Sequence, residues 1–159
     1  ERRPVEDGLD VFTYVQTNAR FHGFEAEASW RLWREGERSL SLDLVADYVR
    51  AESDLGPPSR IPPWAVNGKL VWQGVDLGGW VELRRVGGQD RVSDFELPTD
   101  AYTQLNAGAT WTPPALQGVK LFVEGRNLGD EEIREHASFL KDIAPQPGRG
   151  VRAGFSYRF

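Results

Sequence analysis

The chain has 159 residues, of which 40% are hydrophobic and 27% charged, with a formal net charge of -5 and no cysteine. One domain of this length can bury a core, and the acidic balance without a basic stripe excludes nucleic acid as a partner. The absence of cysteine excludes disulfides and thiolate metal sites. A helical membrane protein is also excluded, because no segment is long and apolar enough to cross a bilayer as a helix. A membrane β-barrel stays possible, because its strands alternate apolar and polar residues and have a hydrophilic average composition.

Apolar and polar residues alternate with a period of two in seven successive segments, which is the pattern of a half-buried strand. In the first segment, Phe24, Ala26, Ala28, Trp30 and Leu32 share one face, opposite a charged face with Glu25 and Glu27. No segment has a sustained helical period, so the chain is predicted to be all-β. The predicted strands lie within 22–33, 38–50, 64–77, 80–86, 102–114, 118–128 and 150–159.

The links between these strands alternate between short and long. The short links are 34–38, 76–79 and 113–118, and the long links are 51–63, 93–101 and 129–148. In an antiparallel up-and-down meander, successive links lie at opposite ends of the sheet. One rim should therefore carry tight turns and the other rim long loops.

This asymmetry is typical of an outer-membrane barrel, with short periplasmic turns and longer outer loops. Aromatic residues near the strand ends fit the girdles of such a barrel: Trp30, Tyr48, Trp64, Trp80, Trp111 and Tyr157. The alternative is a soluble β-barrel binding protein with an internal ligand cavity, because alternation is the signature of any half-buried sheet. The two interpretations differ in whether the apolar face points outward to lipid or inward to a core.

Residues 123–159 carry several short motifs in a fixed order. An N-L-x-D element and a P-x-P-G-R element precede a final strand that ends in an aromatic residue, and a glycine and a glutamate occupy an earlier strand. These residues are Asn127, Leu128 and Asp130, then Pro145, Pro147, Gly148 and Arg149, then Phe159, and upstream Gly23 and Glu25. Together they resemble the C-terminal end of TonB-dependent outer-membrane receptors. Gly129 and Ile133 depart from the pattern, because a bulky apolar residue and an aromatic residue are usual there.

The resemblance implies that the chain forms part of the wall of a transmembrane β-barrel in the outer membrane of a Gram-negative bacterium. It implies a receptor that imports a metal, a metal chelate or a similar scarce nutrient. The implied partners are outer-membrane lipid, the transported metal or chelate, and the TonB complex, which would act through an N-terminal region with its TonB box.

Barrels of this family have 22 strands and contain a plug. About seven strands cannot close such a barrel, so residues 1–159 are expected to be its C-terminal segment, without the plug domain and the N-terminal strands. The absence of methionine is consistent with a removed leader or with a piece of a longer chain.

The last strand places Phe155, Tyr157 and Phe159 on one face. The resemblance implies that this aromatic end is a signal for the barrel-assembly machinery, which would pair with the exposed edge strand. The same rings also suit a girdle that faces lipid, and the two roles are compatible.

His136 lies in the longest predicted loop, near Glu132 and Asp142. Imidazole and carboxylates can bind zinc or a similar divalent ion, so these three residues are a candidate metal site. The alternative is a solvated acidic loop with one incidental histidine. His22 falls on the same side as Phe24 and is expected at the membrane interface.

The sequence suggests no catalytic site and no cofactor. Ser138 and His136 are two residues apart in a loop, and no third residue orients them as a nucleophile and base. The chain is therefore not expected to be an enzyme.

Overall fold

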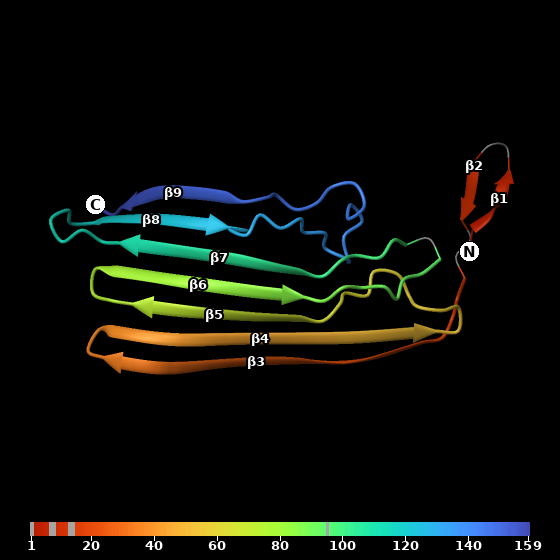
Figure 1. Cartoon of the computed structure of the whole chain (residues 1–159), viewed down its shortest axis with the longest axis horizontal. Coiled ribbons are helices and arrows are strands. Elements are labelled where there is room, and N and C mark those ends of the chain that lie inside the picture. Colours follow the sequence, from red (N-terminus) through yellow and green to blue (C-terminus); the bar gives the residue numbers. More distant parts are fainter. Residues whose placement is uncertain (1, 7–8, 13–14, 95) are drawn as a thin grey trace.

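The computed structural model describes the backbone of residues 2–6, 9–12, 15–94 and 96–159, and side chains from residue 15 onward. Seven strands form one antiparallel sheet in which each strand pairs with the next along the chain (Figure 1). The strands are β3 (Ala19–Glu35), β4 (Arg38–Ser53), β5 (Ala65–Gln73), β6 (Leu77–Val86), β7 (Tyr102–Trp111), β8 (Val119–Arg126) and β9 (Gly150–Tyr157). The predicted all-β meander is confirmed. The described residues include no helix that is long and apolar enough to cross a membrane.

Two further strands, β1 (Arg2–Glu6) and β2 (Leu9–Phe12), form a separate antiparallel hairpin. The sequence analysis did not predict this hairpin. Strands of five and four residues are too short to show a clear alternation.

The links sort by length to opposite ends of the sheet, as predicted. The short links 36–37, 74–76 and 112–118 lie at the left in Figure 1, and the long links 54–64, 87–101 and 127–149 lie at the right. We call these ends the turn rim and the loop rim. The C-terminus lies at the turn rim. Several predicted strand ends were wrong: β5 ends at Gln73 and not at 77, β6 begins at Leu77 and not at 80, and β7 ends at Trp111 and not at 114.

The strand register gathers most apolar residues on one face of the sheet and most charged residues on the other. One row runs through all seven strands and contains only apolar residues and glycine. Its members are Trp30, Leu42, Leu70, Val81, Ala107, Gly125 and Val151. The adjacent row on the other face is polar: Ser29, Asp43, Lys69, Glu82 and Asn106. The predicted assignment of the two faces is therefore confirmed.

Side chains within the polar row bond to one another across the strands. The Ser29 hydroxyl donates to Asp43 Oδ1 at 2.5 Å, and the Asn106 amide donates to Glu82 Oε1 at 3.2 Å. Cross-strand pairs of this kind contribute to sheet stability. Some polar side chains of this face therefore find their hydrogen-bond partners on neighbouring strands of the same face.

Two residues, Leu32 and Trp80, differ from their predicted positions. A β-bulge between Arg31 and Trp33 brings Trp33, and not Leu32, into register with Leu40 on the apolar face. Trp80 lies on the polar face, where its ring covers Gly108 and leaves no room for a Cβ atom there. Trp80 is therefore not a girdle residue on the apolar side.

The sheet has very little core. Large residues of the apolar face are open, with Trp30 52% exposed and Val81 50% exposed. The buried apolar cluster lies at the loop rim, where Ala65, Val86 and Tyr102 form one row of the polar face and Ile133 covers them. The loop rim is consequently where the structure builds a site.

Gly23 provides a test of the β3–β4 pairing. A Cβ atom at this position would overlap the carbonyl oxygen of Tyr48, which is rigid backbone. Gly23→Ala should destabilise the sheet by about 1–3 kcal/mol, as overpacking does. Denaturant unfolding of the refolded barrel would measure the change in unfolding free energy. Gly129→Ala is the control, because its Cβ would meet only Glu131 Cγ at an ordinary 3.7 Å. Equal stabilities of the two variants would contradict the predicted close approach.

Candidate functional site at the loop rim

The loop between β8 and β9 folds back over the polar face of the sheet. Ile133 is 1% exposed and packs on the row described above. Next to it, Glu135 Oε1 accepts hydrogen bonds from the Tyr102 hydroxyl at 2.8 Å and from Arg84 Nη1 at 3.2 Å. Arg84 and Tyr102 are polar-face residues of β6 and β7. The loop is therefore anchored to the polar side of the wall by one apolar and two polar contacts.

The base of the loop is closed by Asn127, which is 1% exposed. Its side-chain amide donates to the carbonyl oxygens of Glu131 at 2.8 Å and Pro147 at 3.4 Å, and its Oδ1 accepts from the Glu131 amide at 3.1 Å. Its φ is +47°, a conformation that asparagine tolerates better than most residues. The Asn127 side chain thus joins the two ends of the loop.

Asp130 makes a second connection between the ends of the loop. Its Oδ1 accepts from the Arg149 amide at 2.8 Å, and its carboxylate lies 3.9 Å from the Arg149 guanidinium. A Cβ atom at Gly148 would come within 2.9 Å of the same oxygen, so only glycine fits there without displacing Asp130. We call Asn127, Asp130, Pro147, Gly148 and Arg149 the base clasp.

The base clasp contains most of the residues of the two C-terminal sequence motifs. Leu128 belongs to the same region: its amide donates to the Leu105 carbonyl at 2.8 Å, and its side chain covers Gly125. The two upstream motif residues lie elsewhere, with Gly23 against Tyr48 and Glu25 in register with Asp47. The C-terminal motifs therefore shape a loop, and the N-terminal motif positions a strand pair.

A buried polar cluster fixes the tip of the loop to the β6–β7 link. Glu96 Oε1 accepts from Lys141 Nζ at 3.0 Å, and both of its oxygens accept from the Arg60 amide at 2.9 and 3.1 Å. His136 Nδ1 lies 2.9 Å from the Thr99 hydroxyl and 3.3 Å from Lys141 Nζ. The cluster joins three links of the loop rim.

The protonation of this cluster follows from its donors. The Lys141 ammonium can only donate, so His136 Nδ1 is the acceptor and the ring hydrogen lies on Nε2, which is 3.3 Å from Glu96 Oε1. Burial lowers the pKa of His136, and the adjacent Lys141 charge lowers it further. Burial alone would raise the pKa of Glu96, but the hydrogen bonds from Lys141 and Arg60 outweigh it and lower that pKa. The cluster therefore holds a neutral imidazole, a carboxylate and an ammonium group.

The structure does not bring His136, Glu132 and Asp142 together as a ligand set. His136 is 3% exposed and engaged by Thr99 and Lys141, whereas Glu132 binds Arg134 Nε at 2.7 Å on the surface. Among the described residues, no group of three histidine or acidic side chains could hold a metal ion. The expectation of an incidental histidine in solvent also fails, because His136 is a buried structural residue.

Sequence reasoning missed Glu96, Thr99 and Lys141. Glu96 and Thr99 are 45 and 37 residues from the partners they bind in the loop, Lys141 and His136. Spacing along the chain carries no signal for contacts at this separation. Only the folding of the loop onto the polar face brings these residues together.

The aromatic side chains at the C-terminal end of the chain are exposed. Phe155 is 73% and Tyr157 59% exposed, and the Tyr157 and Phe159 rings lie 6.5 Å apart. Phe155 and Tyr157 belong to β9, an edge strand of the described sheet, and Phe159 follows it at the turn rim. Their predicted role in barrel assembly stays a prediction.

Residues 2–128 match the model of the family described as TonB dependent receptor-like, beta-barrel. The chain belongs to this family. A solved structure of the copper transporter OprC has the same fold, with a TM-score of 0.73 and 23% sequence identity. The match covers 90% of this chain and 24% of that one, so the chain spans much less than the whole length of this structural relative. No curated protein matches the chain in sequence.

Family membership assigns the two faces of the sheet. TonB-dependent receptor barrels lie in the Gram-negative outer membrane, with lipid on the apolar face and a polar lumen. The loop between β8 and β9, which covers the polar face, therefore lies on the lumen side. The family consists of transport receptors and not of enzymes. The alternative of a soluble binding barrel, with the apolar face turned inward, does not agree with this assignment.

Asn127→Ala should release the loop from the wall. The substitution removes three side-chain hydrogen bonds and places alanine at φ +47°. We expect a loss of about 2 kcal/mol of local stability, because buried backbone partners are left unpaired. Hydrogen exchange over residues 131–146 would measure it. Asp130→Asn keeps an oxygen for the Arg149 amide and should leave exchange nearly unchanged. Equal protection in the Asn127 variant and the unmodified protein would show that the clasp is dispensable.

Acidification should loosen the loop in two stages. The lowered pKa of His136 means that its contribution to stability is complete above about pH 6.5 and is lost as the pH falls below that value. The lowered pKa of Glu96 adds a second loss that begins near pH 4.5. Hydrogen exchange of the loop across this pH range would show both stages. His136→Gln should remove the first stage and keep the second, and an unchanged first stage would assign it to another group.

Proposed function

We propose that this chain forms the C-terminal part of the barrel wall of a TonB-dependent receptor that imports a metal, a metal chelate or a similar scarce nutrient across the outer membrane. The match to the receptor barrel family over residues 2–128 is the observation that carries the proposal. The name of the structural neighbour, a copper transporter, supports a metal as the cargo.

In this proposal, the β8–β9 loop contributes to uptake because it lies over the lumen face of the barrel wall. The loop is anchored over the lumen face by Ile133 and Glu135, so it narrows the outer entrance to the lumen. A cavity of ≈ 350 Å³ lies beside the loop base, between the loop and the polar face. Its lining includes Gln104, Glu124, Arg126, Gln146 and Arg152. These amide, guanidinium and carboxylate groups can bind a polar chelate by hydrogen bonds and charge.

The remaining partners belong to the same proposal. The edge strands β3 and β9 each have one unpaired side in the described sheet, and further barrel strands would complete them. The exposed Phe155, Tyr157 and Phe159 would be the end recognised by the barrel-assembly machinery. Energy would come from the TonB complex through an N-terminal plug region.

The proposal is tested by copper accumulation in cells that express the full receptor as their only route for copper. Accumulation should require both the receptor and TonB. Replacing residues 131–146 with a short flexible linker should lower accumulation severalfold, because the ordered lining of the outer entrance is lost while the strands are kept. Surface labelling and heat-dependent gel mobility would verify that the barrel has assembled.

The matched control replaces residues 113–117, a turn-rim link, with a linker of the same composition. This variant should transport normally if it assembles, since the turn rim lies at the opposite end of the sheet from the entrance. Copper accumulation that is independent of TonB would contradict the proposed mechanism. Accumulation of an iron chelate in place of copper would keep the mechanism and correct the cargo.

A further inference from the structure

The β3–β4 hairpin extends the lipid-facing side of the wall toward the loop rim, beyond the aromatic belt. Phe24 and Tyr48 are paired across the two strands, with ring centroids 6.0 Å apart. The exposed Trp64 ring lies in the adjoining link, next to Ala65 of β5. Aromatic residues at the end of an apolar face mark the boundary between hydrocarbon and headgroups. The residues immediately beyond this row therefore lie at headgroup level.

The next two pairs on the same face are charged or ionisable. His22 pairs with Arg50, and Arg20 pairs with Glu52. Arg91, from the link between β6 and β7, joins them by binding Glu52 Oε1 at 3.2 Å. We call Arg20, His22, Arg50, Glu52 and Arg91 the basic cluster.

Glu52 organises the basic cluster. Its Oε1 lies 3.2 Å from Arg50 Nη2 and 3.2 Å from Arg91 Nη2, so one carboxylate bridges two guanidinium groups. Three arginines against one glutamate leave two positive charges in excess, in a chain whose net charge is -5. The side chains of Arg50, Glu52 and Arg91 are 42%, 57% and 36% exposed, and Arg20 is exposed as well. Two distant segments of the chain thus converge to make a positive patch.

Apolar surface adjoins the patch. Tyr48 and Trp64 line a hollow of ≈ 160 Å³ together with Arg50, Arg91 and Pro62. A further carboxylate, Asp54, lies beyond Glu52 along the chain and accepts a hydrogen bond from Asn18 at 3.1 Å. Glu25 and Asp47, although close in sequence, belong to the opposite, lumen face. On the lipid-facing side, the positively charged cluster therefore lies next to the aromatic side chains of Tyr48 and Trp64.

We propose that the basic cluster binds the phosphate of an anionic lipid headgroup in the outer leaflet, with the acyl chains lying along Phe24, Tyr48 and the apolar face below. Guanidinium groups bind phosphate oxygens in a bidentate manner, and membrane-surface arginines attract anionic lipid. The proposal depends on the membrane location of the family and not on the proposed import function. A failure of copper uptake would leave it intact.

The test is lipid retention by the full receptor in nanodiscs of phosphatidylcholine mixed with phosphatidylglycerol, followed by native mass spectrometry. Each charge near a membrane surface contributes a factor of about 5 in lipid affinity. Arg20→Gln should therefore weaken phosphatidylglycerol retention about fivefold. Glu52→Gln should act in the opposite direction, because it adds one net positive charge to the cluster. A stable fold in both variants is verified by circular dichroism and gel mobility.

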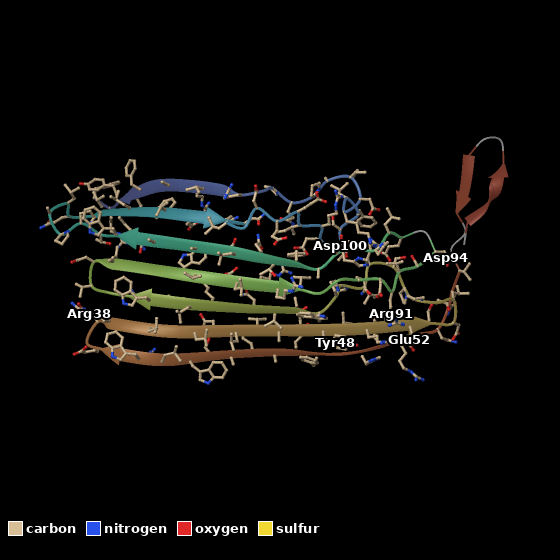
Figure 2. The ribbon with its side chains drawn as sticks, viewed as in Figure 1. Arg38, Tyr48, Glu52, Arg91, Asp94 and Asp100 are labelled. Atoms are coloured by element: carbon tan, nitrogen blue, oxygen red, sulfur yellow. The ribbon has the colours of Figure 1, made fainter. Side chains whose placement is uncertain are left out.

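Arg38→Gln is the matched control, since Arg38 is an exposed arginine at the turn rim of the same hairpin, far along β4 from the cluster (Figure 2). It should retain lipid as the unmodified receptor does. Arg20→Lys keeps the charge but loses the bidentate donors, so it should restore only part of the retention that Arg20→Gln loses. Equal retention by the Arg20→Gln, Glu52→Gln and Arg38→Gln variants would overturn the proposal. Displacement of the lipid by inorganic phosphate at the same concentration would overturn it too, by assigning the site to free phosphate.

Discussion

The structure depends on one continuous strand register that keeps two chemically different surfaces apart across seven strands. A shift of one residue in any pair would turn leucine, valine and tryptophan to the lumen and carboxylates to lipid. The row from Trp30 to Val151 stays on one face through all seven strands, and only the bulge at Leu32 interrupts the register of the sheet. In hydrocarbon, backbone hydrogen bonds between strands are obligatory, so register errors are costly in backbone pairing as well as in side-chain burial. The one bulge of the seven-stranded sheet, at Leu32, lies near the turn rim, where the hairpin is about to reverse.

Among the described residues, the β8–β9 loop forms a second layer on the polar face, and it does so at the loop rim. At the loop rim, Ala65, Val86 and Tyr102 form a row of small and apolar residues within the polar face. Ile133 covers this row, and Glu135 satisfies the polar atoms beside it. The loop is thus placed by complementarity to three neighbouring strands, while the base clasp holds its two ends together. The packing on three strands and the base clasp together explain how the long β8–β9 link takes a defined conformation over the lumen face.

The fold could be predicted from the sequence because each of its determinants is local. Alternation of period two fixes the faces, and link length fixes the rim, so strands such as β7 follow from ten neighbouring residues. The bulge at Leu32 and the inward ring of Trp80 could not be predicted, since each depends on a partner strand: Leu40 for the bulge and Gly108 for the ring. The C-terminal motif residues were recognised, but their physical role needed the structure, because Asn127 and Pro147 meet only when the loop closes.

The buried cluster of Glu96, Lys141, His136 and Thr99 shows why the metal hypothesis failed at the level of geometry. A histidine near several acidic residues in sequence is a reasonable ligand set, but ligand sets require side chains that converge. Here the loop turns its acidic residues Glu132 and Glu135 to different partners, Arg134 and the Arg84–Tyr102 pair. The imidazole is left facing an ammonium group, which repels a cation. The Glu96 carboxylate is already paired with Lys141. A protonated His136 would therefore add a second, unpaired positive charge to a buried site, which would be strongly destabilising, so the imidazole stays neutral. Of the three proposed ligands, only His136 has a part in fixing the loop, through its contact with Thr99 in the β6–β7 link.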